Sequence, residues 1–364
     1  MLIRQLQLEG FRRFDAAQLS PLPGFNLVTG DNGSGKTTLL EALHLLAHAR
    51  SFRGRVRDGL IRQGSEALQV YVEWEDAQGA THRAGLRHTG SAWQARLDGQ
   101  DVAQLGQLCA ALAVVTFEPG SHALVEGSGE VRRRYLDWGM FHVEQRFLPL
   151  WRRYARALKQ RNSLLRQGGG PALEAWEYEL AQAGEALTDL RDAYIEGLRP
   201  HLQDMLPRML PAAESIELGL HPGWRRQEMS LADALLLARE RDQALGHTTV
   251  GPHRADLRFT LQALPGRAGL SRGQAKQLAL ALLMAQAAHL AECRGEWPVL
   301  QLDDLGSELD RQHQRRVLEM LAETGAQVLV TGTERPSGWP VDVIPAAVFH
   351  VEHAQVLGPL PLEE

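Results

Sequence analysis

A glycine-rich loop that ends in lysine and threonine constrains the fold of this chain more than any other feature. Residues 30–37 have the sequence GDNGSGKT, with an apolar run at 25–29 before them and an apolar stretch at 39–49 after them. The pattern G-x-x-x-x-G-K-[ST] between a buried strand and a helix predicts backbone N–H groups that surround phosphate oxygens. A glycine-rich turn with a chance lysine is the alternative, and the strand–loop–helix setting disfavours it.

The expected roles within this loop follow from side-chain chemistry. Lys36 reaches the β- and γ-phosphate oxygens, and the Thr37 hydroxyl is a ligand of Mg²⁺. The N-terminus of the following helix adds a partial positive charge. The residues that we expect to bind the nucleotide are Gly30, Asp31, Asn32, Gly33, Ser34, Gly35, Lys36, Thr37 and Thr38.

Two aspartates after a second apolar strand complete the predicted chemistry. The segment VLQLDD, residues 299–304, places Asp303 at the carboxyl edge of a parallel sheet, where it can hold Mg²⁺ beside Thr37. An acid that only caps the strand end is the alternative. Asp304 is placed to orient the attacking water or accept its proton, so Lys36, Asp303 and Asp304 form the expected catalytic set. Aspartate is one methylene shorter than glutamate, which predicts slow hydrolysis; alternatively, Asp304 only helps to coordinate the metal.

A third segment indicates that two copies of the chain cooperate. The sequence SRGQ precedes an apolar helix expected over 275–286, and a serine and a glycine at a helix start form an anion site. One γ-phosphate does not need two such sites from one chain, so we expect this site to cap ATP bound to another copy in a two-fold dimer. An ordinary serine N-cap is the alternative. The expected contacts are Ser271, Arg272, Gly273 and Gln274.

Hydrophobic patterns predict strands in the first third of the chain. Alternation over residues 2–8 predicts an edge-facing strand, and period-two alternation over 68–97 predicts an antiparallel meander. Residues 113–117 predict another buried strand.

The character of the sequence changes after residue 119. Helical spacing over 130–166 and 171–245, with a Gly-Gly-Gly-Pro break between them, predicts two helical arms, and strands return after residue 250. We therefore predict an α/β fold with a discontinuous domain, residues 1–118 and 246–364, and a helical insertion lobe over 119–245.

Composition excludes several classes of protein. Two cysteines cannot form a disulfide framework, which favours a reducing cytosol. No run approaches the ~18 apolar residues of a membrane span, and the first residues lack the apolar core of a signal peptide. We expect a cytoplasmic protein, and a net charge of −5 does not exclude nucleic-acid binding, because such binding depends on local basic clusters.

The order of these segments resembles the ATP-binding-cassette (ABC) ATPases. Residues 307–310, SELD, are similar to the D-loop of that superfamily. More narrowly, the chain resembles the RecF family of SMC-like DNA-repair ATPases over residues 1–334, through LQLEGFRRF at 6–14, RSFRG at 50–54, FEP at 117–119, RRRYLD at 132–137 and TVGPHR at 249–254. The resemblance implies an ABC-type ATPase head, with a mixed sheet, an antiparallel β subdomain and a helical insertion lobe.

The same resemblance implies a function. RecF-family proteins are ATPases of recombinational repair that bind DNA when ATP-bound and, with RecO and RecR, help to load recombinase at gaps. ATP and Mg²⁺ would be the cofactors, and the ATP-dependent homodimer would bind double-stranded DNA at a gap or junction.

Three departures from the wider superfamily affect the expected site. Arg272 stands where many cassette proteins have glycine. The strand over 327–331 ends without the switch histidine of transporters, and Thr331 or Thr333 is expected to sense the γ-phosphate instead. No glutamine of the lobe-connecting loop can be placed.

The predicted helix over 148–166 offers a DNA-binding face. At 100° per residue, four basic residues fall within a stripe of about 80°, opposite Leu150, Trp151, Tyr154, Leu158 and Leu165. An arginine-rich solvated face is the alternative. The basic residues of this stripe are Arg152, Arg156, Lys159 and Arg166.

Two further groups have both a functional and a structural interpretation. His253 and Arg254 belong either to a hydrogen-bonded structural turn or to a loop that moves when the dimer closes. A second basic cluster either contacts the nucleotide base or reports its state to DNA, or it is a loop held by ion pairs. Its residues are Arg50, Arg53, Arg55, Arg57 and Arg62.

The hypothesis from the sequence is an ATP-driven DNA clamp with slow hydrolysis as a reset. A nucleotide-gated scaffold for repair partners stays open as an alternative. A transporter-type ATPase is disfavoured by the arginine-rich insertion and the missing histidine.

Overall fold

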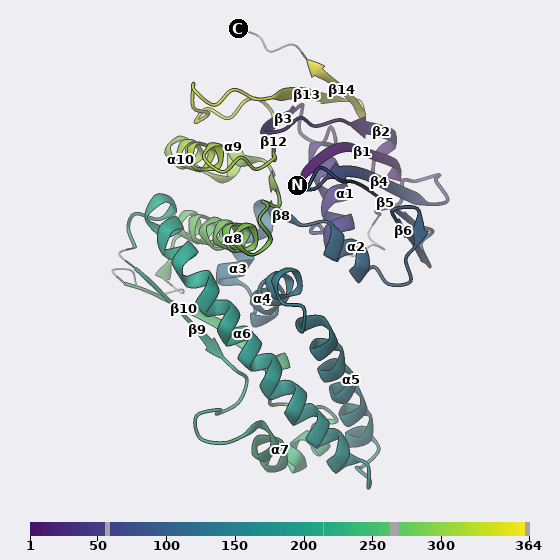
Figure 1. Ribbon diagram of the computed structural model, residues 1–364, viewed down its shortest axis with the longest axis vertical. Coiled ribbons are helices and arrows are strands. Elements are labelled where there is room, and N and C mark those ends of the chain that lie inside the picture. The colour runs from purple at the N-terminus through teal and green to yellow at the C-terminus, as the bar shows by residue number, and fades with distance from the viewer. Residues whose placement is uncertain (55–58, 214, 263–268, 361–364) are drawn as a thin grey trace. The chain divides into compact units, whose positions relative to one another are not determined.

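The chain forms two units in the computed structural model, which describes residues 1–54, 59–213, 215–262 and 269–360 (Figure 1). The first unit comprises Met1–His122, Arg208–Leu210 and Arg272–Glu364, and the second comprises Ala123–Pro207 and Pro211–Ser271.

A mostly parallel sheet carries the lysine loop and the aspartates of the first unit. Its strand order is β14-β13-β3-β12-β11-β8, and all neighbours are parallel except β13 and β14. The registers Leu302↔Phe117 and Thr331↔Val28 bring the carboxyl ends of four strands to one edge. The strands are β3 (Phe25–Thr29), β8 (Val114–Phe117), β11 (Val299–Leu302), β12 (Val328–Thr331), β13 (Ala347–Glu352) and β14 (Gln355–Leu360).

An antiparallel sheet forms the other layer of the first unit, in the order β2-β1-β4-β5-β6-β7. The expected meander is confirmed by β4, β5 and β6. The expected edge position of the first strand is wrong, because β1 pairs with β2 on one side and β4 on the other. The strands are β1 (Leu2–Phe11), β2 (Phe14–Leu19), β4 (Leu68–Glu75), β5 (Thr81–His88), β6 (Trp93–Leu97) and β7 (Gln100–Asp101).

Helix α1 (Lys36–His48) lies in the core between the two sheets (Figure 1). Its apolar residues pack with Leu6 and Val70 of the antiparallel sheet and with Val114 and Leu329 of the parallel sheet. Burial on all sides explains why the sequence after the glycine-rich loop is almost continuously apolar. The remaining helices of this unit are α2 (Gly106–Ala111), η1 (Pro119–His122), α8 (Arg272–Arg294), α9 (Leu305–Glu308) and α10 (Arg311–Ala322).

The second unit is built around two long helices, α5 (Phe147–Arg166) and α6 (Leu173–Met209), on either side of the predicted glycine break. Ion pairs join the helices, including Arg153 with Glu179. The other elements are α3 (Ala123–Glu126), α4 (Gly129–Val143), α7 (Leu231–Leu245), η2 (Pro252–Arg254), β9 (Ile216–His221) and β10 (Asp256–Leu261).

One strand changes the expected division of the chain. The segment 171–245 was expected to be helical, but it contains β9, which pairs antiparallel with β10 through Leu218↔Phe259 and Leu220↔Leu257. This pairing places residues 246–271 with the second unit, whereas the sequence assigned them to the ATPase domain. Among the described residues, no helix combines the length and the apolar character needed to cross a membrane.

Candidate nucleotide-binding site

The glycine-rich loop joins β3 to α1 and closes around its lysine. The Lys36 ammonium donates to the carbonyl oxygens of Gly30, at 2.6 Å, and Asp31, at 2.9 Å. Burial lowers the pKa of Lys36, while Asp304 and Asp303 oppose this shift. The lysine therefore lies inside the loop, where a phosphate group would contact it.

Two glycines of the loop have no room for a side chain. Gly30 has φ +142°, and a Cβ there would lie 2.2 Å from the Val351 carbonyl oxygen. Gly35 has φ +126°, and a Cβ there would lie 2.6 Å from the Phe14 ring. The loop needs these glycines to pass between β13 and β2 and to begin α1 at Lys36.

Two threonine hydroxyls donate to one carboxylate oxygen at the sheet edge. The hydroxyls of Thr37 and Thr331 donate to Asp303 Oδ1 at 2.9 and 2.7 Å. Burial raises the pKa of Asp303, and the two hydrogen bonds act in the opposite direction. A threonine hydroxyl and a carboxylate are hard oxygen donors, so Thr37 and Asp303 fit Mg²⁺. Thr333 is exposed, and Thr331 is therefore the threonine at the site.

Asp304 begins helix α9 in a left-handed conformation, with φ 51°. Its N–H donates to Thr331 Oγ1 at 2.9 Å, and its carboxylate accepts a hydrogen bond from the Ser307 hydroxyl. Thr331 thus contacts both aspartates, and the position of Asp304 depends on the residues that hold Asp303.

These residues surround a cavity of about 330 Å³ in the first unit. Three arginines lie at its wall: Arg12 and Arg13, which were not predicted, and Arg53, whose cluster has contact with the nucleotide as one of its predicted alternatives. Their only sequence signal is their place in the FRRF and RSFRG motifs. The cavity is lined by Arg12, Arg13, Asn32, Gly33, Gly35, Lys36, Thr37, Thr38, Arg53, Pro119, Asp303, Asp304 and Thr331.

The SRGQ segment lies at the start of α8, and none of its residues lines this cavity. Ser271 directly precedes the helix and is exposed, as are Arg272 and Gly273, while Gln274 is half-buried. One turn further on, the Lys276 ammonium pairs with Glu308 of α9 at 2.8 Å. This ion pair connects the SRGQ helix to the SELD segment within one chain.

The predicted basic stripe lies on the exposed face of α5, in the second unit. Tyr154 and Leu165 of the opposite face are buried, and Leu150 and Leu158 are half-buried. The expected burial of Trp151 is wrong, because 41% of this side chain is exposed. Trp151 lies about 60° from Tyr154 around the helix, at the edge of the covered face. The exposed basic residues are Arg152, Arg156, Lys159 and Arg166.

A buried arginine at the centre of the covered face of α5 was missed. Arg161 has no exposed surface, and its guanidinium binds Asp242 at 2.8 Å and Glu177 at 3.0 Å. It also donates to Thr248 Oγ1 at 2.8 Å. Helical periodicity was the available signal, because Arg161 lies about 180° around the helix from Arg152, among the apolar residues.

The RRRYLD and GPHR motifs form a hydrogen-bonded framework in the second unit. Arg132 is buried and binds Asp256 at 2.6 Å. The His253 ring contacts the Tyr154 hydroxyl at 2.7 Å and the Thr248 carbonyl at 3.0 Å, and burial lowers its pKa to about 4. The interpretation of His253 as a hydrogen-bonded histidine in a structural turn is confirmed, and movement of the turn stays a prediction.

The second basic cluster is divided by the structure. Arg53 lines the cavity, and Arg62 pairs with Asp15 at 3.5 Å. Arg55 and Arg57 lie outside the described residues.

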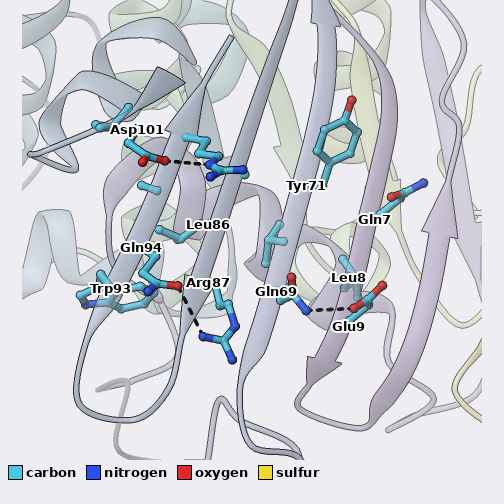
Figure 2. A pocket seen from close by; sticks show the side chains of 15 residues that line it. Gln7, Leu8, Glu9, Gln69, Tyr71, Leu86, Arg87, Trp93, Gln94 and Asp101 are labelled. Carbon is cyan, nitrogen blue, oxygen red and sulfur yellow. Dashed lines mark hydrogen bonds and ion pairs between the residues drawn. The ribbon is translucent and has the colours of Figure 1, made fainter. Parts of the chain in front are cut away.

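A larger cavity, of about 730 Å³, lies on the outer face of the antiparallel sheet (Figure 2). Several of its polar side chains bind one another: Arg96 pairs with Asp101 at 2.7 Å, and Gln69 donates to Glu9 at 3.1 Å. None of the predicted site residues lines it.

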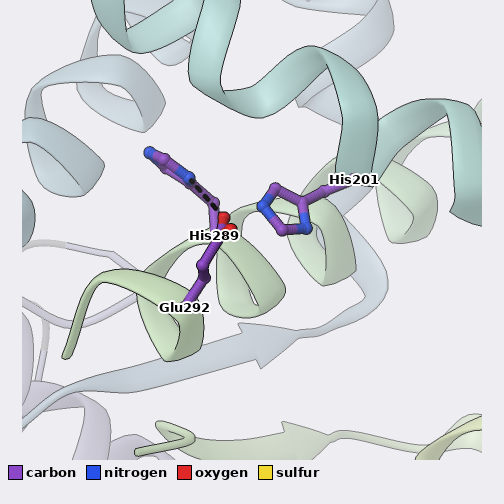
Figure 3. Close-up of side chains that lie close together, drawn as sticks. All are labelled: His201, His289 and Glu292. Atoms are coloured by element: carbon purple, nitrogen blue, oxygen red, sulfur yellow. Dashed lines mark ion pairs between the residues drawn. The ribbon is translucent and has the colours of Figure 1, made fainter. Parts of the chain in front are cut away.

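His289 and Glu292 lie one turn apart on α8, with 4.0 Å between Nδ1 and the carboxylate (Figure 3). The third side chain drawn, His201, belongs to α6 of the second unit, whereas this pair belongs to the first. Two ligands on one helix are too few for a structural or catalytic zinc centre, which uses at least three.

Comparison with known proteins identifies the family. The family model described as "RecF/RecN/SMC N terminal domain" matches residues 2–344. A protein of Stenotrophomonas maltophilia (strain R551-3) named "DNA replication and repair protein RecF" is 61% identical over 363 residues, or 98% of this chain and 99% of the relative. The chain belongs to the RecF family of SMC-like ATPases. A RecF protein of Azotobacter vinelandii (strain DJ / ATCC BAA-1303) is 41% identical over 98% of both chains.

Solved structures agree with this family. The structure titled "Structure of the recombination mediator protein RecF-ATP in RecFOR pathway" has a TM-score of 0.87 and 26% identity, over 98% of this chain and 96% of that chain. An Smc head bound to the C-winged helix domain of ScpA has a TM-score of 0.59 at 15% identity, over 98% of this chain and 96% of that one, and supports the fold alone. This RecF-family chain therefore has the ABC-type ATPase head that the sequence predicted.

Proposed function

We propose that this RecF-family chain is an ATP-dependent DNA-binding protein of recombinational repair. The observation that carries the proposal is the meeting of Lys36, Thr37 and Asp303 at one cavity whose wall also bears three arginines. Cationic walls suit a polyphosphate, and a relative at 61% identity is named DNA replication and repair protein RecF.

Each loop residue has a role in ATP binding. Backbone N–H groups of residues 30–35 and the start of α1 face the phosphates, and Lys36 exchanges its carbonyl partners for phosphate oxygens. Thr37 and Asp303 hold Mg²⁺, which would neutralise phosphate charge when bound. Thr331 fixes the Asp303 oxygen that it shares with Thr37.

Hydrolysis is slow in this proposal. Asp304 accepts a proton from, or orients, the attacking water, but its short side chain is already hydrogen-bonded to Ser307. Replacing Asp304 by Asn should preserve ATP binding and lower turnover, and unchanged turnover would exclude a catalytic role.

A second copy completes the site. Ser271, Arg272, Gly273 and Gln274 do not line the cavity of their own chain, so we infer that they cap ATP bound to another copy. Analytical ultracentrifugation with ATP–Mg²⁺ tests this inference. A stable dimer of the Lys36→Met variant would contradict it.

The closed dimer binds double-stranded DNA through α5. Arg152 and Arg166 span about 21 Å at ~1.5 Å per residue, and the four stripe residues can neutralise four phosphates. With one stripe in contact with the DNA, the logarithm of the affinity should fall linearly with the logarithm of the salt concentration, with a slope of about −3.6. The affinity then falls about 150-fold between 50 and 200 mM salt. RecR and RecO, implied by family resemblance, are the proposed partners at gaps or junctions.

Fluorescence anisotropy of a labelled duplex tests the DNA proposal directly. We expect tight, salt-dependent binding with ATP–Mg²⁺ and weak binding without it. The variant Lys159→Ala/Arg166→Ala should lower the salt slope by about half. Arg153→Ala is the matched control, since Arg153 lies on the same helix but binds Glu179. Equal slopes in all three proteins would exclude the stripe as the DNA face.

A nucleotide-gated scaffold for repair partners is the second candidate. The hydrogen bond between the Asp304 carboxylate and Ser307 favours the scaffold, because a carboxylate held in this way should give slow ATP hydrolysis. Slow hydrolysis would limit how long the ATP-bound state lasts. Absence of DNA binding in both nucleotide states, with ATP-driven dimerisation intact, would support the scaffold.

A further inference from the structure

A fully buried carboxylate on α1 lies beside the cavity wall. Glu41 has no exposed surface, although most neighbouring positions of this helix are apolar. Its two oxygens accept hydrogen bonds from Arg12, at 3.1 Å from Nε and 2.7 Å from Nη2. Arg12 is one of the arginines that line the cavity.

The same carboxylate also organises the segment after α1. The Ser51 hydroxyl donates to Glu41 and accepts the N–H of Arg53 at 2.9 Å. The Arg53 guanidinium lies 3.8 Å from Glu41, and Arg53 lines the cavity as well. One buried group thus contacts two arginines that are far apart in the sequence.

The backbone supports this arrangement on the Arg12 side. Arg12 has φ 55°, a left-handed conformation that is strained for arginine, and its N–H donates to the Leu60 carbonyl at 2.7 Å. A buried carboxylate is costly unless it is paired, and Glu41 is paired with Arg12 and Arg53 of the cavity wall and with Ser51. Strain and a buried charge at one point indicate a positioning role.

We propose that Glu41 is a positioning residue for nucleotide binding, which holds the Arg12 and Arg53 guanidinium groups toward the phosphate chain of a nucleoside triphosphate. The proposal rests on the proposed ATP-binding function of the cavity. Arg12 binds Glu41 through Nε and Nη2, and its Nη1 contacts the Gly59 carbonyl at 3.4 Å, so several contacts hold this guanidinium at the cavity wall. A triphosphate benefits more than a diphosphate, because it has more oxygen atoms to accept from two arginines.

Neutralisation of charge and positioning by Glu41 predict opposite changes in ATP affinity when Glu41 is replaced by Gln. If Glu41 only neutralised nearby arginines, its replacement by Gln would raise the positive potential of the cavity and tighten ATP binding. If Glu41 positions them, Glu41→Gln weakens ATP binding despite the added positive potential.

The experiment measures binding of fluorescent ATP and ADP analogues, with Mg²⁺, to the full chain. We expect Glu41→Gln to weaken ATP binding by about tenfold and ADP binding by less than about threefold, as expected for one charge-assisted hydrogen bond. Glu75→Gln is the matched control, since Glu75 binds Arg4 at 2.7 Å on the surface of the same unit. Tighter or unchanged ATP binding by a folded Glu41→Gln protein overturns the proposal.

A double-mutant cycle separates positioning from a structural effect. In an Arg12→Ala/Arg53→Ala background, Glu41→Gln should change ATP affinity by less than twofold, because the groups that it positions are gone. An undiminished effect there overturns the proposal. If the Glu41→Gln protein does not fold, Glu41→Asp is tested instead. This variant should also lose more affinity for ATP than for ADP. Failure of the unmodified protein to bind ATP would instead refute the proposed function.

Discussion

Thr331 offers a sharp test of how the two aspartates are held. It is fully buried at the end of β12, donates to Asp303 Oδ1 and accepts the N–H of Asp304. Replacement by valine keeps the shape of the side chain and removes both hydrogen bonds.

The size of the effect follows from these two contacts. A hydrogen bond to a charged group contributes about 1.5–3 kcal/mol, and an orphaned buried N–H costs about 1–3 kcal/mol. The valine methyl leaves no large cavity, so we expect the free energy of unfolding of the first unit to fall by about 3 kcal/mol. Because the Asp303 oxygen loses one of its two fixed donors, Mg²⁺-dependent ATP binding should weaken by about tenfold, or about 1.4 kcal/mol.

The assay combines urea unfolding with binding of a fluorescent ATP analogue, with and without Mg²⁺. Thr331→Ser is the control, since serine keeps the hydroxyl and loses only the methyl group. The serine variant should retain most of the Mg²⁺-dependent affinity. If serine and valine variants lose affinity equally, the hydroxyl is not what holds Asp303, and the reasoning fails.

Three further predictions concern stability and coupling. Burial lowers the pKa of His48 and His253 to about 4 from an ordinary value of about 6.5, so the unfolded chain binds protons first. These two histidines should contribute fully to the free energy of unfolding above about pH 6.5, and the contribution should fall as the pH is lowered toward 4. At pH 5 the loss should be at most about 2 kcal/mol per histidine. Equal urea midpoints at pH 7.5 and pH 5 would contradict this. Arg161→Met should destabilise the second unit by about 3–5 kcal/mol, since it removes one ion pair from each of two buried acids, and a melting shift below 2 °C would refute it. Lys276→Glu should weaken ATP-driven dimerisation, and the swap Lys276→Glu/Glu308→Lys should restore it in sedimentation experiments; absence of rescue would show that the ion pair is not the cause.

Short sequence motifs predicted those site residues that lie together in one segment of the chain. The lysine loop, the strand before it and the aspartates after β11 each have a short signature, and parallel pairing then brings them to one edge. The choice between Thr331 and Thr333 needed the structure, because strand register decides which of them faces Asp303.

The missed residues depend on pairing between distant segments. Glu41 in an apolar helix and Arg161 on a covered helix face are charges whose partners come from elsewhere in the chain. Strand β9 was not predicted, because its six residues lie within a Leu- and Ala-rich region with helical spacing. Its pairing partner, β10, begins 35 residues after β9 ends.

The position of β3 in its sheet has a consequence for synthesis. Its two neighbours, β12 and β13, come from residues after 327, so the strand that carries the lysine loop has no partner while most of the chain is being made. The antiparallel sheet uses only residues 2–101 and can form early on the ribosome. The late arrival of β12 and β13 therefore means that a nascent chain acquires its nucleotide site only near the end of translation, and unfinished chains should be unable to bind ATP.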